Sequence, residues 1–231
     1  MRIAGWHGTT LVDFPSRVAS ILFFAGCNLR CPFCHNPGLV LPDHFDPAAS
    51  VDFDDILKKL SERRNFISGV VFTGGEPLMQ ADLPEAVAAV RGLGLDVKLD
   101  TNGTWPSRLA DVLGQVQYVA LDLKTSPARY PEATGGMADF SGVRATLDLL
   151  RAHQIPYELR TTVVPGLVTL EDIEALVPLV QDAPLFALQS FVSRETLDPS
   201  WSGLSAASPA LVQEMAALLA TSARKVIIRS N

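Results

Sequence analysis

The sequence predicts an α/β protein built around a parallel β-sheet. Seven short apolar runs rich in Val, Ile and Leu alternate along the 231 residues with longer segments of helical periodicity. Most of the runs are continuously apolar, which is typical of strands covered on both faces of a parallel sheet. Six or seven strand–helix units in one chain favour a barrel or partial barrel. A doubly wound open sheet is the alternative, because periodicity does not separate the two.

Each predicted strand is an apolar run bounded by turn residues. In chain order the strands cover Val18–Phe24, Gly69–Thr73, Leu95–Leu99, Tyr118–Leu123, Tyr157–Val164, Leu185–Phe191 and Val226–Ile228. Residues 1–16 precede the first strand and contain two glycines and a proline, so we expect an irregular or hairpin-like lead-in there. The prolines and glycines of Ser126–Gly136 predict a long surface loop.

The predicted helices combine an apolar stripe with capping residues. Asp52 caps the first helix. Thr169 and Asp172 form a capping box for a later helix, which Pro178 should end or kink. The other helices carry the apolar sets Leu83–Val90, Leu109–Leu113, Phe140–Leu150 and Leu211–Leu219. No linker interrupts the alternation, so residues 1–231 are predicted to form a single domain.

Composition and charge exclude several classes of protein. A hydrophobic content of 48% excludes disorder as the main state. A net charge of -6 argues against charge-driven binding to nucleic acid or to anionic membranes. The three cysteines fall between Cys27 and Cys34, unlike the spacing of a secreted disulfide framework. Their clustering predicts a metal or redox centre in a reducing compartment, so we expect a cytoplasmic protein.

Polar residues gather at the carboxyl ends of the predicted strands. In a parallel barrel these ends open on one face, where ligands bind and catalysis occurs. The coincidence over successive strands predicts a functional site at this face. Its members are Cys27, Cys31 and Cys34 after the first strand, Gly75 and Glu76 after the second, Asp100 and Asn102 after the third, Asp122 and Lys124 at the fourth, and Arg160 in the fifth.

The cysteine spacing C-x3-C-x2-C allows a short loop to wrap three thiolates around a soft metal centre. An iron–sulfur cube has four iron corners and usually takes four cysteines, whereas this chain has three. One iron would therefore stay open to an outside ligand. A zinc site completed by His44 and a set of three buried, metal-free thiols are the alternatives.

The turns after the second and third strands have both a functional and a plain structural interpretation. Two glycines allow a ligand to approach the backbone, and the carboxylate of Glu76 could hold an ammonium group. Asp100 and Asn102 offer a carboxylate and an amide that could bind hydroxyl groups. In both places an ordinary tight turn is the alternative.

Charged residues in the fourth and fifth strands are harder to explain by stability. Asp122 and Lys124 are two residues apart, so both point to the same face of a strand. A buried ion pair is weak evidence for stability, which favours a functional role. A functional role is likewise favoured for Arg160, whose guanidinium group suits the binding of a carboxylate.

Taken together, these motifs resemble the radical S-adenosylmethionine superfamily. The resemblance rests on the three cysteines with the aromatic Phe33 before the third, and on the Gly-Gly-Glu-Pro turn that begins at Gly74. Within the superfamily, the run Gly26–Pro37 and the segments around Asp100, Asp122 and Arg160 look like the glycyl-radical-enzyme activating enzymes.

Softer matches point to one group of these activating enzymes. The lead-in Gly8–Pro15 and the late segments Leu188–Phe191 and Thr196–Asp198 look most like the activating proteins of anaerobic ribonucleoside-triphosphate reductase. The resemblance covers nearly the whole chain. It implies a partial (β/α)6 TIM-type barrel with parallel strands. It also implies one 4Fe–4S cluster, S-adenosylmethionine, a large glycyl-radical enzyme as protein substrate, and a low-potential electron donor such as flavodoxin or ferredoxin.

The resemblance also implies a role for each site residue. Cys27, Cys31 and Cys34 would hold the cluster, Phe33 and His35 would lie beside the adenine, and Gly75 with Glu76 would face the methionine amino group. Asp100, Asp122 and Lys124 would lie near the methionyl and ribose parts, Arg160 would steady charge at the same end, and the two aspartates could hold a monovalent cation as in some relatives.

Two features depart from relatives in the superfamily. Pyruvate formate-lyase activators carry a histidine late in the sixth strand, where this chain has Phe191. The short loop between Cys34 and Asp52 leaves no room for the second cluster domain of some relatives. Three other interpretations stay open: a pyruvate formate-lyase-type activator, a radical enzyme acting on a small molecule, and a zinc-stabilised binding module.

Overall fold

The computed structural model describes residues 1–41, 45–46, 50–192 and 194–230. Within these residues, eight strands form one sheet in chain order, β2 to β8 parallel and β1 antiparallel to β2. The strands are β1 (Ile3–Thr10), β2 (Ala19–Phe24), β3 (Gly69–Gly74), β4 (Asp96–Thr101), β5 (Tyr118–Asp122), β6 (Tyr157–Val163), β7 (Phe186–Ser190) and β8 (Val226–Arg229). No pairing among the described residues joins β8 back to β1, so the barrel is partial, as predicted.

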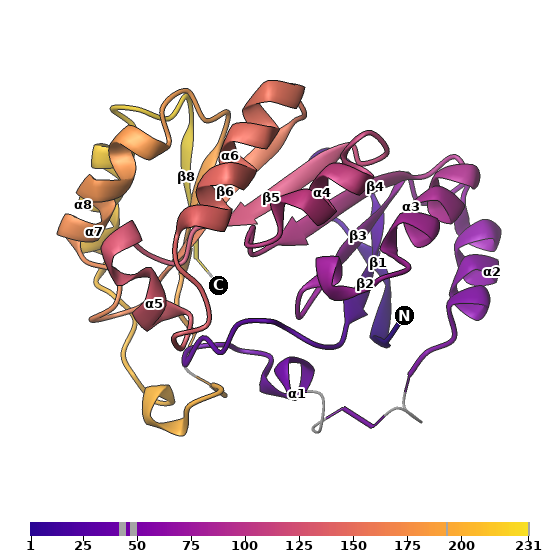
Figure 1. Cartoon of the computed structure of the whole chain (residues 1–231), viewed down its shortest axis with the longest axis horizontal. Helices are drawn as coiled ribbons and strands as arrows, with labels where there is room; N and C mark the ends of the chain where they lie inside the picture. The colour runs from indigo at the N-terminus through magenta and orange to yellow at the C-terminus, as the bar shows by residue number, and fades with distance from the viewer. Residues whose placement is uncertain (42–44, 47–49, 193, 231) are drawn as a thin grey trace.

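The longer helices lie around the outside of the curved sheet, whereas α1 lies at its open side (Figure 1). The helices of the described residues are α1 (Pro37–Val40), α2 (Phe53–Arg63), α3 (Leu83–Gly92), α4 (Pro106–Leu113), α5 (Tyr130–Ala133), α6 (Ser141–His153), α7 (Leu170–Leu176) and α8 (Pro209–Leu219). The segment that follows β2 crosses the open side of the sheet toward α1. This segment contains the three cysteines.

The helix boundaries follow from the predicted capping chemistry. The Asp52 side chain accepts hydrogen bonds from the backbone N–H groups of Asp54 and Asp55 at the start of α2. Thr169 and Asp172 complete the predicted capping box of α7. That helix ends before a 3₁₀ turn containing Pro178, whose ring and missing N–H do not suit a helix interior.

Two segments differ in detail from the sequence prediction. Residues 3–10 form β1, so the lead-in takes the hairpin-like of its two predicted forms. The prediction of a surface loop over Ser126–Gly136 is wrong, because this segment folds into a 3₁₀ turn and the helix α5. Tyr130 is fully buried there and packs edge-on against Phe140. The apolar residues of so short a helix do not build up a recognisable periodicity.

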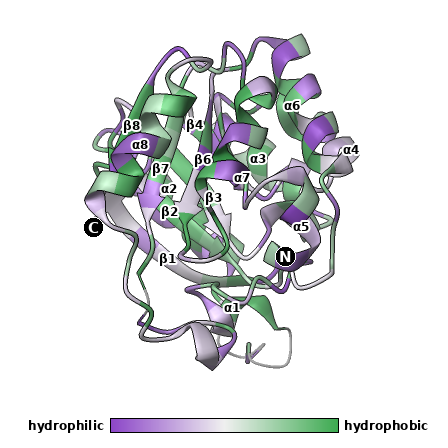
Figure 2. Ribbon diagram, turned by 90° about the vertical axis from the view of Figure 1, so that its left-hand side faces the viewer, coloured by the Kyte–Doolittle hydropathy of each residue, from purple (hydrophilic) through white to green (hydrophobic). Residues whose placement is uncertain are grey.

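The central strands have two chemically different faces. Successive side chains of a strand point to opposite sides of the sheet. One face is apolar and belongs to the core that the helices cover, with Val97, Leu99, Val119, Leu121 and Leu159. Figure 2 shows the strands largely hydrophobic and the helices α6 and α8 two-faced. The other face carries Lys98, Asp100, Asp122, Glu158 and Arg160 into the partial barrel.

A glycine junction fixes the start of the cysteine segment against the end of β3. The backbone N–H of Gly75 donates to the Phe24 carbonyl (2.8 Å), and that of Glu76 donates to the Gly26 carbonyl (2.8 Å). A Cβ atom at position 75 would lie 2.1 Å from the Gly26 carbonyl oxygen. The junction therefore requires a residue without a side chain.

We predict that Gly75→Ala lowers the free energy of unfolding by at least about 1–3 kcal/mol, because the backbone carbonyl cannot move aside freely. Gly114→Ala is the matched control. Gly114 has helical backbone angles and open space around its Cα, so alanine should raise stability by about 0.4–1 kcal/mol. Urea denaturation should show a lower free energy of unfolding for Gly75→Ala and a higher one for Gly114→Ala. Equal stability of Gly75→Ala and the wild type would contradict the steric argument.

Candidate active site

The carboxyl ends of the parallel strands open on a cavity of about 280 Å³. Eleven of the twelve predicted site residues line it, and Glu76 is the exception. The structure therefore brings together residues that lie as far apart in the chain as Cys27 and Arg160. The lining residues from the predicted set are Cys27, Cys31, Phe33, Cys34, His35, Gly75, Asp100, Asn102, Asp122, Lys124 and Arg160.

The segment Cys27–Cys34, called the cysteine loop from here on, is held by segments that come much later in the chain. The Arg30 backbone N–H donates to the Thr134 carbonyl (3.1 Å), in the segment wrongly predicted as a surface loop. The backbone N–H groups of Leu197 and Asp198 donate to the carbonyls of Cys34 (3.1 Å) and Pro32 (3.0 Å). Two later segments of the chain thus fix the backbone of the loop.

Apolar side chains of the loop anchor it to the barrel. Leu29, Cys31 and Phe33 are buried in a small cluster with Val164, Leu167 and Phe191. This leaves the loop backbone fixed while the three thiols line the cavity. Anchoring of this kind holds a ligand set in one arrangement before anything binds.

Two aromatic contacts complete the wall around the loop. The rings of His35 and Phe191 have centroids 5.6 Å apart, and those of Phe33 and Trp201 lie 6.5 Å apart. Phe191, which stands where pyruvate formate-lyase activators have a histidine, therefore supports His35 from behind. Burial, with a further effect of the Lys124 charge, lowers the pKa of His35 below its ordinary value.

The thiol environment fits a metal cluster. Burial raises the pKa of Cys27 to about 11 and that of Cys31 to about 12, so neither is a ready nucleophile at neutral pH. The Leu29 backbone N–H points at the Cys27 sulfur (3.5 Å), and the Asn102 amide lies 4.0 Å from the same atom. Hydrogen bonds to sulfur tune iron–sulfur clusters. Three cavity-lining thiols with such donors suit a cluster that takes three cysteines.

The zinc alternative gains no support from the geometry. No set of three or more His, Cys, Asp or Glu side chains within the described part of the chain could hold a single metal ion. Three thiols spread around a cavity suit a polynuclear cluster, whose corners are separate metal atoms, better than one tetrahedral ion. His44, the proposed fourth zinc ligand, lies outside the described residues.

Asn102 connects the turn after β4 to the cysteine loop. Its amide nitrogen donates to the Asn28 side-chain oxygen (2.9 Å), and its own oxygen accepts from the Thr104 hydroxyl (2.7 Å). The Asn28 amide in turn donates to Thr104 (2.8 Å). Asn102 is therefore a structural link as well as a lining residue of the cavity.

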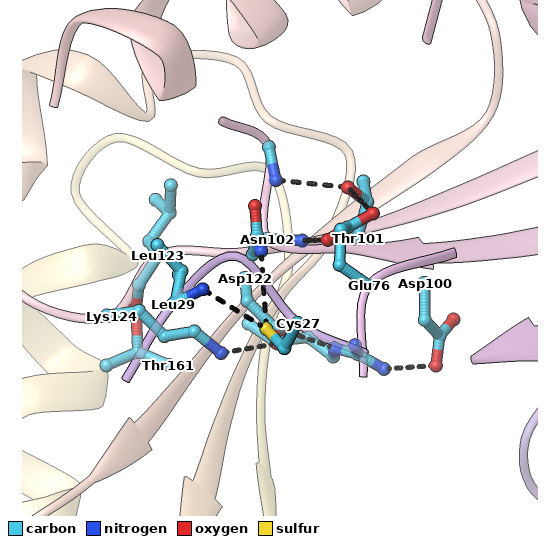
Figure 3. A network of polar contacts seen from close by, with 12 residues as sticks. Cys27, Leu29, Glu76, Asp100, Thr101, Asn102, Asp122, Leu123, Lys124 and Thr161 are labelled. Atoms are coloured by element: carbon cyan, nitrogen blue, oxygen red, sulfur yellow. Dashed lines mark hydrogen bonds and ion pairs between the residues drawn. The ribbon is translucent and has the colours of Figure 1, made fainter. Parts of the chain in front are cut away.

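The carboxylate of Glu76 has its hydrogen-bond partners inside the protein. Its side chain is 1% exposed and does not line the cavity, and Figure 3 shows it beside Thr101 and Asn102. One oxygen accepts from the backbone N–H of Leu78 (3.0 Å) and from the Thr101 hydroxyl (2.9 Å), and the other accepts from the backbone N–H of Asn102 (2.8 Å). With all these donors inside the protein, Glu76 ties two turns together.

Inward-facing charges of three strands form a chain across the cavity floor. Lys98 pairs with one oxygen of Asp100, and Arg160 donates to the other (3.0 Å). Arg160 also donates to Asp122 (2.8 Å), whose second oxygen accepts from Lys124 (2.8 Å; Figure 3). The chain holds three cations against two carboxylates, and of these charged side chains Lys124, Arg160 and both aspartates line the cavity while Lys98 lies beneath it.

The chain of ion pairs changes the expectation for the two aspartates. The sequence allowed them to hold a monovalent cation. In the structure each of the four carboxylate oxygens already accepts from a cationic side chain. Burial alone would raise the pKa of both aspartates, but Arg160 and the neighbouring lysines outweigh it and hold both below the ordinary value.

Two further charged residues of this interior were not among the predicted site residues. Lys98 is 1% exposed, and Glu158 is equally buried in a bidentate pair with Arg229 (2.6 and 3.1 Å). Both lie in runs that were treated as apolar. The available signal was the alternation along the strands, which places Lys98 two residues before Asp100 and Glu158 two before Arg160.

The comparisons with known proteins agree with this site. Residues 21–180 match the Radical SAM superfamily, and the chain belongs to that superfamily. Its enzymes use a 4Fe–4S cluster and S-adenosylmethionine, and this chain is accordingly an enzyme of that type.

Proteins that are similar to this chain in sequence include activating enzymes of glycyl-radical enzymes. A Methanocaldococcus jannaschii protein named as a glycyl-radical enzyme activating enzyme is 28% identical over 235 residues, which cover 99% of this chain and 95% of the relative. The pyruvate formate-lyase-activating enzyme of Clostridium pasteurianum is 29% identical and covers 78% of this chain and 76% of the relative.

A solved structure shows the same fold. SuiB of Streptococcus suis, bound to its precursor peptide SuiA, matches with a TM-score of 0.70 and 13% identity. The match covers 90% of this chain and 48% of SuiB, so this chain spans about half of that protein.

Among the described residues there is no helix long and apolar enough to cross a membrane.

We predict a pH-dependent stability effect at Glu76. Burial raises its pKa to about 7 from an ordinary 4.5, so the folded state holds a proton that the unfolded state releases. The stability this contributes is present at low pH and is lost as the pH rises through 7. Relative to Glu76→Gln, which does not titrate, the wild type should lose about 1 kcal/mol between pH 6 and pH 8.

Urea denaturation of the cluster-loaded proteins at several pH values measures this difference. Glu62→Gln is the control, because Glu62 is exposed. Curves for the wild type and Glu76→Gln that stay parallel from pH 6 to pH 8 would refute the effect.

Proposed function

We propose that this chain is a glycyl-radical-enzyme activating enzyme. The observation that carries the proposal is that three clustered thiols and a chain of fixed charges line the same cavity at the mouth of a partial barrel. The near full-length match to the Methanocaldococcus jannaschii relative supports it. When bound, the cluster and S-adenosylmethionine supply a reductive C–S cleavage whose radical product can take a hydrogen atom from a glycine Cα.

The residues of the cavity divide the work of holding these groups. Cys27, Cys31 and Cys34 would hold the cluster, which would supply the reducing electron to an S-adenosylmethionine bound beside it. Gly75 lines the same cavity, and the close Gly26 carbonyl requires this position to lack a side chain. Lys124 and Arg160 supply the positive charge that a carboxylate needs, while Asp100 and Asp122 keep both cations in position.

The adenosine part is assigned to the wall of the cysteine loop. Phe33 and His35 both line the cavity, and each is supported by an aromatic ring behind it. Flat rings of this kind suit an adenine face. Asn102 offers an amide to the polar atoms of the ligand at the cavity edge.

We further propose that the protein partner is anaerobic ribonucleoside-triphosphate reductase. The support is the resemblance of the late segment Thr196–Asp198, whose backbone braces the cysteine loop. The Clostridium pasteurianum relative makes a pyruvate formate-lyase-type partner the second candidate. A low-potential donor such as flavodoxin or ferredoxin would reduce the cluster. The chain would act as one domain in the cytoplasm, where thiols stay reduced.

Anaerobic reconstitution should give about four irons per chain, because three cysteines hold a cube with one open corner. Cys31→Ala should lose the cluster and, with it, the formation of 5'-deoxyadenosine from S-adenosylmethionine under reducing conditions. Iron analysis and product chromatography check this. Cys31→Ala with full iron content and full turnover would disprove the assignment.

A separate prediction concerns the partner. A mixture of this enzyme, S-adenosylmethionine, reductant and anaerobic ribonucleoside-triphosphate reductase should give a glycyl doublet in electron paramagnetic resonance. The transfer needs the glycine Cα close to the radical carbon, so the doublet should vanish when that glycine is changed to alanine. A doublet with pyruvate formate-lyase and none with the reductase would make pyruvate formate-lyase the partner and reject the reductase. Turnover of a free small molecule with no doublet from either protein would reject the activating function.

A further inference from the structure

One buried group has no part in the proposed ligand contacts. Lys98 is 1% exposed and does not line the cavity, yet it carries a full charge among buried residues. In the sheet register it lies beside Val71 on one side and Tyr118 on the other. Both neighbours belong to an apolar cluster that also contains Phe14 and Ile21. The stem of Lys98 thus lies among apolar side chains, and its ammonium group points toward the ion pairs of the cavity floor.

The ammonium group of Lys98 reaches one acceptor in that layer. It pairs with the first carboxylate oxygen of Asp100, two residues along the same strand. The second oxygen of Asp100 accepts from Arg160 (3.0 Å) and from the Thr73 hydroxyl (3.3 Å). Asp100 is therefore held from below by Lys98 and from the side by Arg160, with its carboxylate at the cavity surface.

Stability does not explain this arrangement. Replacing a buried ion pair by apolar residues of similar volume is often neutral or stabilising, because the desolvation cost of two charges is large. The side chains beside Lys98 are already apolar, so an apolar residue would fit at this position. What the lysine provides is a fixed positive charge against a carboxylate that faces the ligand cavity.

We propose that Lys98 is a positioning residue that acts as the built-in counter-ion of Asp100, so that the cavity binds S-adenosylmethionine without a soluble monovalent cation. The inference rests on the proposed function, because S-adenosylmethionine is the ligand. Its basis is the occupancy of all four carboxylate oxygens of Asp100 and Asp122 by cationic side chains of the protein. A soluble cation would have to displace one of these side chains.

Removing Lys98 should convert the site into one that needs a cation. In Lys98→Met the first oxygen of Asp100 keeps its place but loses its cationic partner. Carboxylate and hydroxyl oxygens are hard donors that suit alkali cations. K⁺ is small enough to approach this oxygen, whereas tetramethylammonium is not. The variant should therefore recover with K⁺, which a purely structural role for Lys98 would not produce.

The experiment measures the Kd of S-adenosylmethionine by isothermal titration calorimetry on the cluster-loaded protein. Each protein is titrated in KCl and in tetramethylammonium chloride at equal ionic strength, so that screening is the same. The wild-type Kd should agree in the two salts within about twofold. Lys98→Met should bind about tenfold or more weakly in tetramethylammonium, as expected for the loss of a hydrogen bond to a charged group, and KCl should restore most of the loss.

Lys58→Met is the matched control. Lys58 also pairs with an aspartate, Asp55 at 3.1 Å, but on the exposed face of α2. Its replacement should leave the Kd unchanged in both salts. Iron content and thermal melting of each variant show whether the protein is folded and loaded.

Each outcome separates the two proposals. A wild type that needs K⁺ to bind S-adenosylmethionine overturns the built-in counter-ion and leaves the proposed function intact. This arm does not depend on the folding of any variant. A Lys98→Met variant that binds normally, or binds weakly with no recovery in K⁺, also overturns it. A cluster-loaded wild type that binds no S-adenosylmethionine in either salt counts against the proposed function itself.

Discussion

The ion pairs between the inward faces of β4, β5 and β6 are the constraint on which the rest of the site depends. A one-residue slip in any of these strands would move its charges into the apolar layer under the helices. It would also bring Val97, Leu99 or Leu159 into the cavity. The requirement to keep Asp100, Asp122 and Arg160 paired therefore fixes the register of three strands. The apolar outer face enforces the same register from the other side.

The cysteine loop depends on that frame through long-range contacts. It begins at the glycine junction between β2 and β3, and it is braced by residues 134, 197 and 198. Asn102 fastens it to the turn after β4. Because these braces come from segments far apart in the chain, the thiols take up their positions only when most of the barrel has formed. The shape of the cluster site is in this sense a property of the whole fold.

The sequence was informative where one residue type has one dominant use. Apolar runs located all seven parallel strands, and Asp52, Thr169 and Pro178 marked helix ends correctly. The cysteine spacing and the strand ends identified nine of the residues that line the cavity, and the resemblance added Phe33 and His35. Prediction failed where a polar group is satisfied by a partner that the sequence does not reveal. Lys98 was hidden between apolar neighbours, and Glu76 found its donors in the backbone of distant turns.

The two segments that carry the resemblance to reductase activators have very different positions. In the antiparallel pair Thr10 lies opposite Ala19, at the start of β2, so the lead-in turn is at the end of the barrel remote from the cysteines. The late segment lies beside the cysteine loop, where the Leu197 backbone N–H donates to Cys34. The cavity charges serve a reaction common to the superfamily and cannot by themselves distinguish one protein substrate from another. Because the late segment contacts the cysteine loop, it would bear more directly on partner choice than the remote lead-in does.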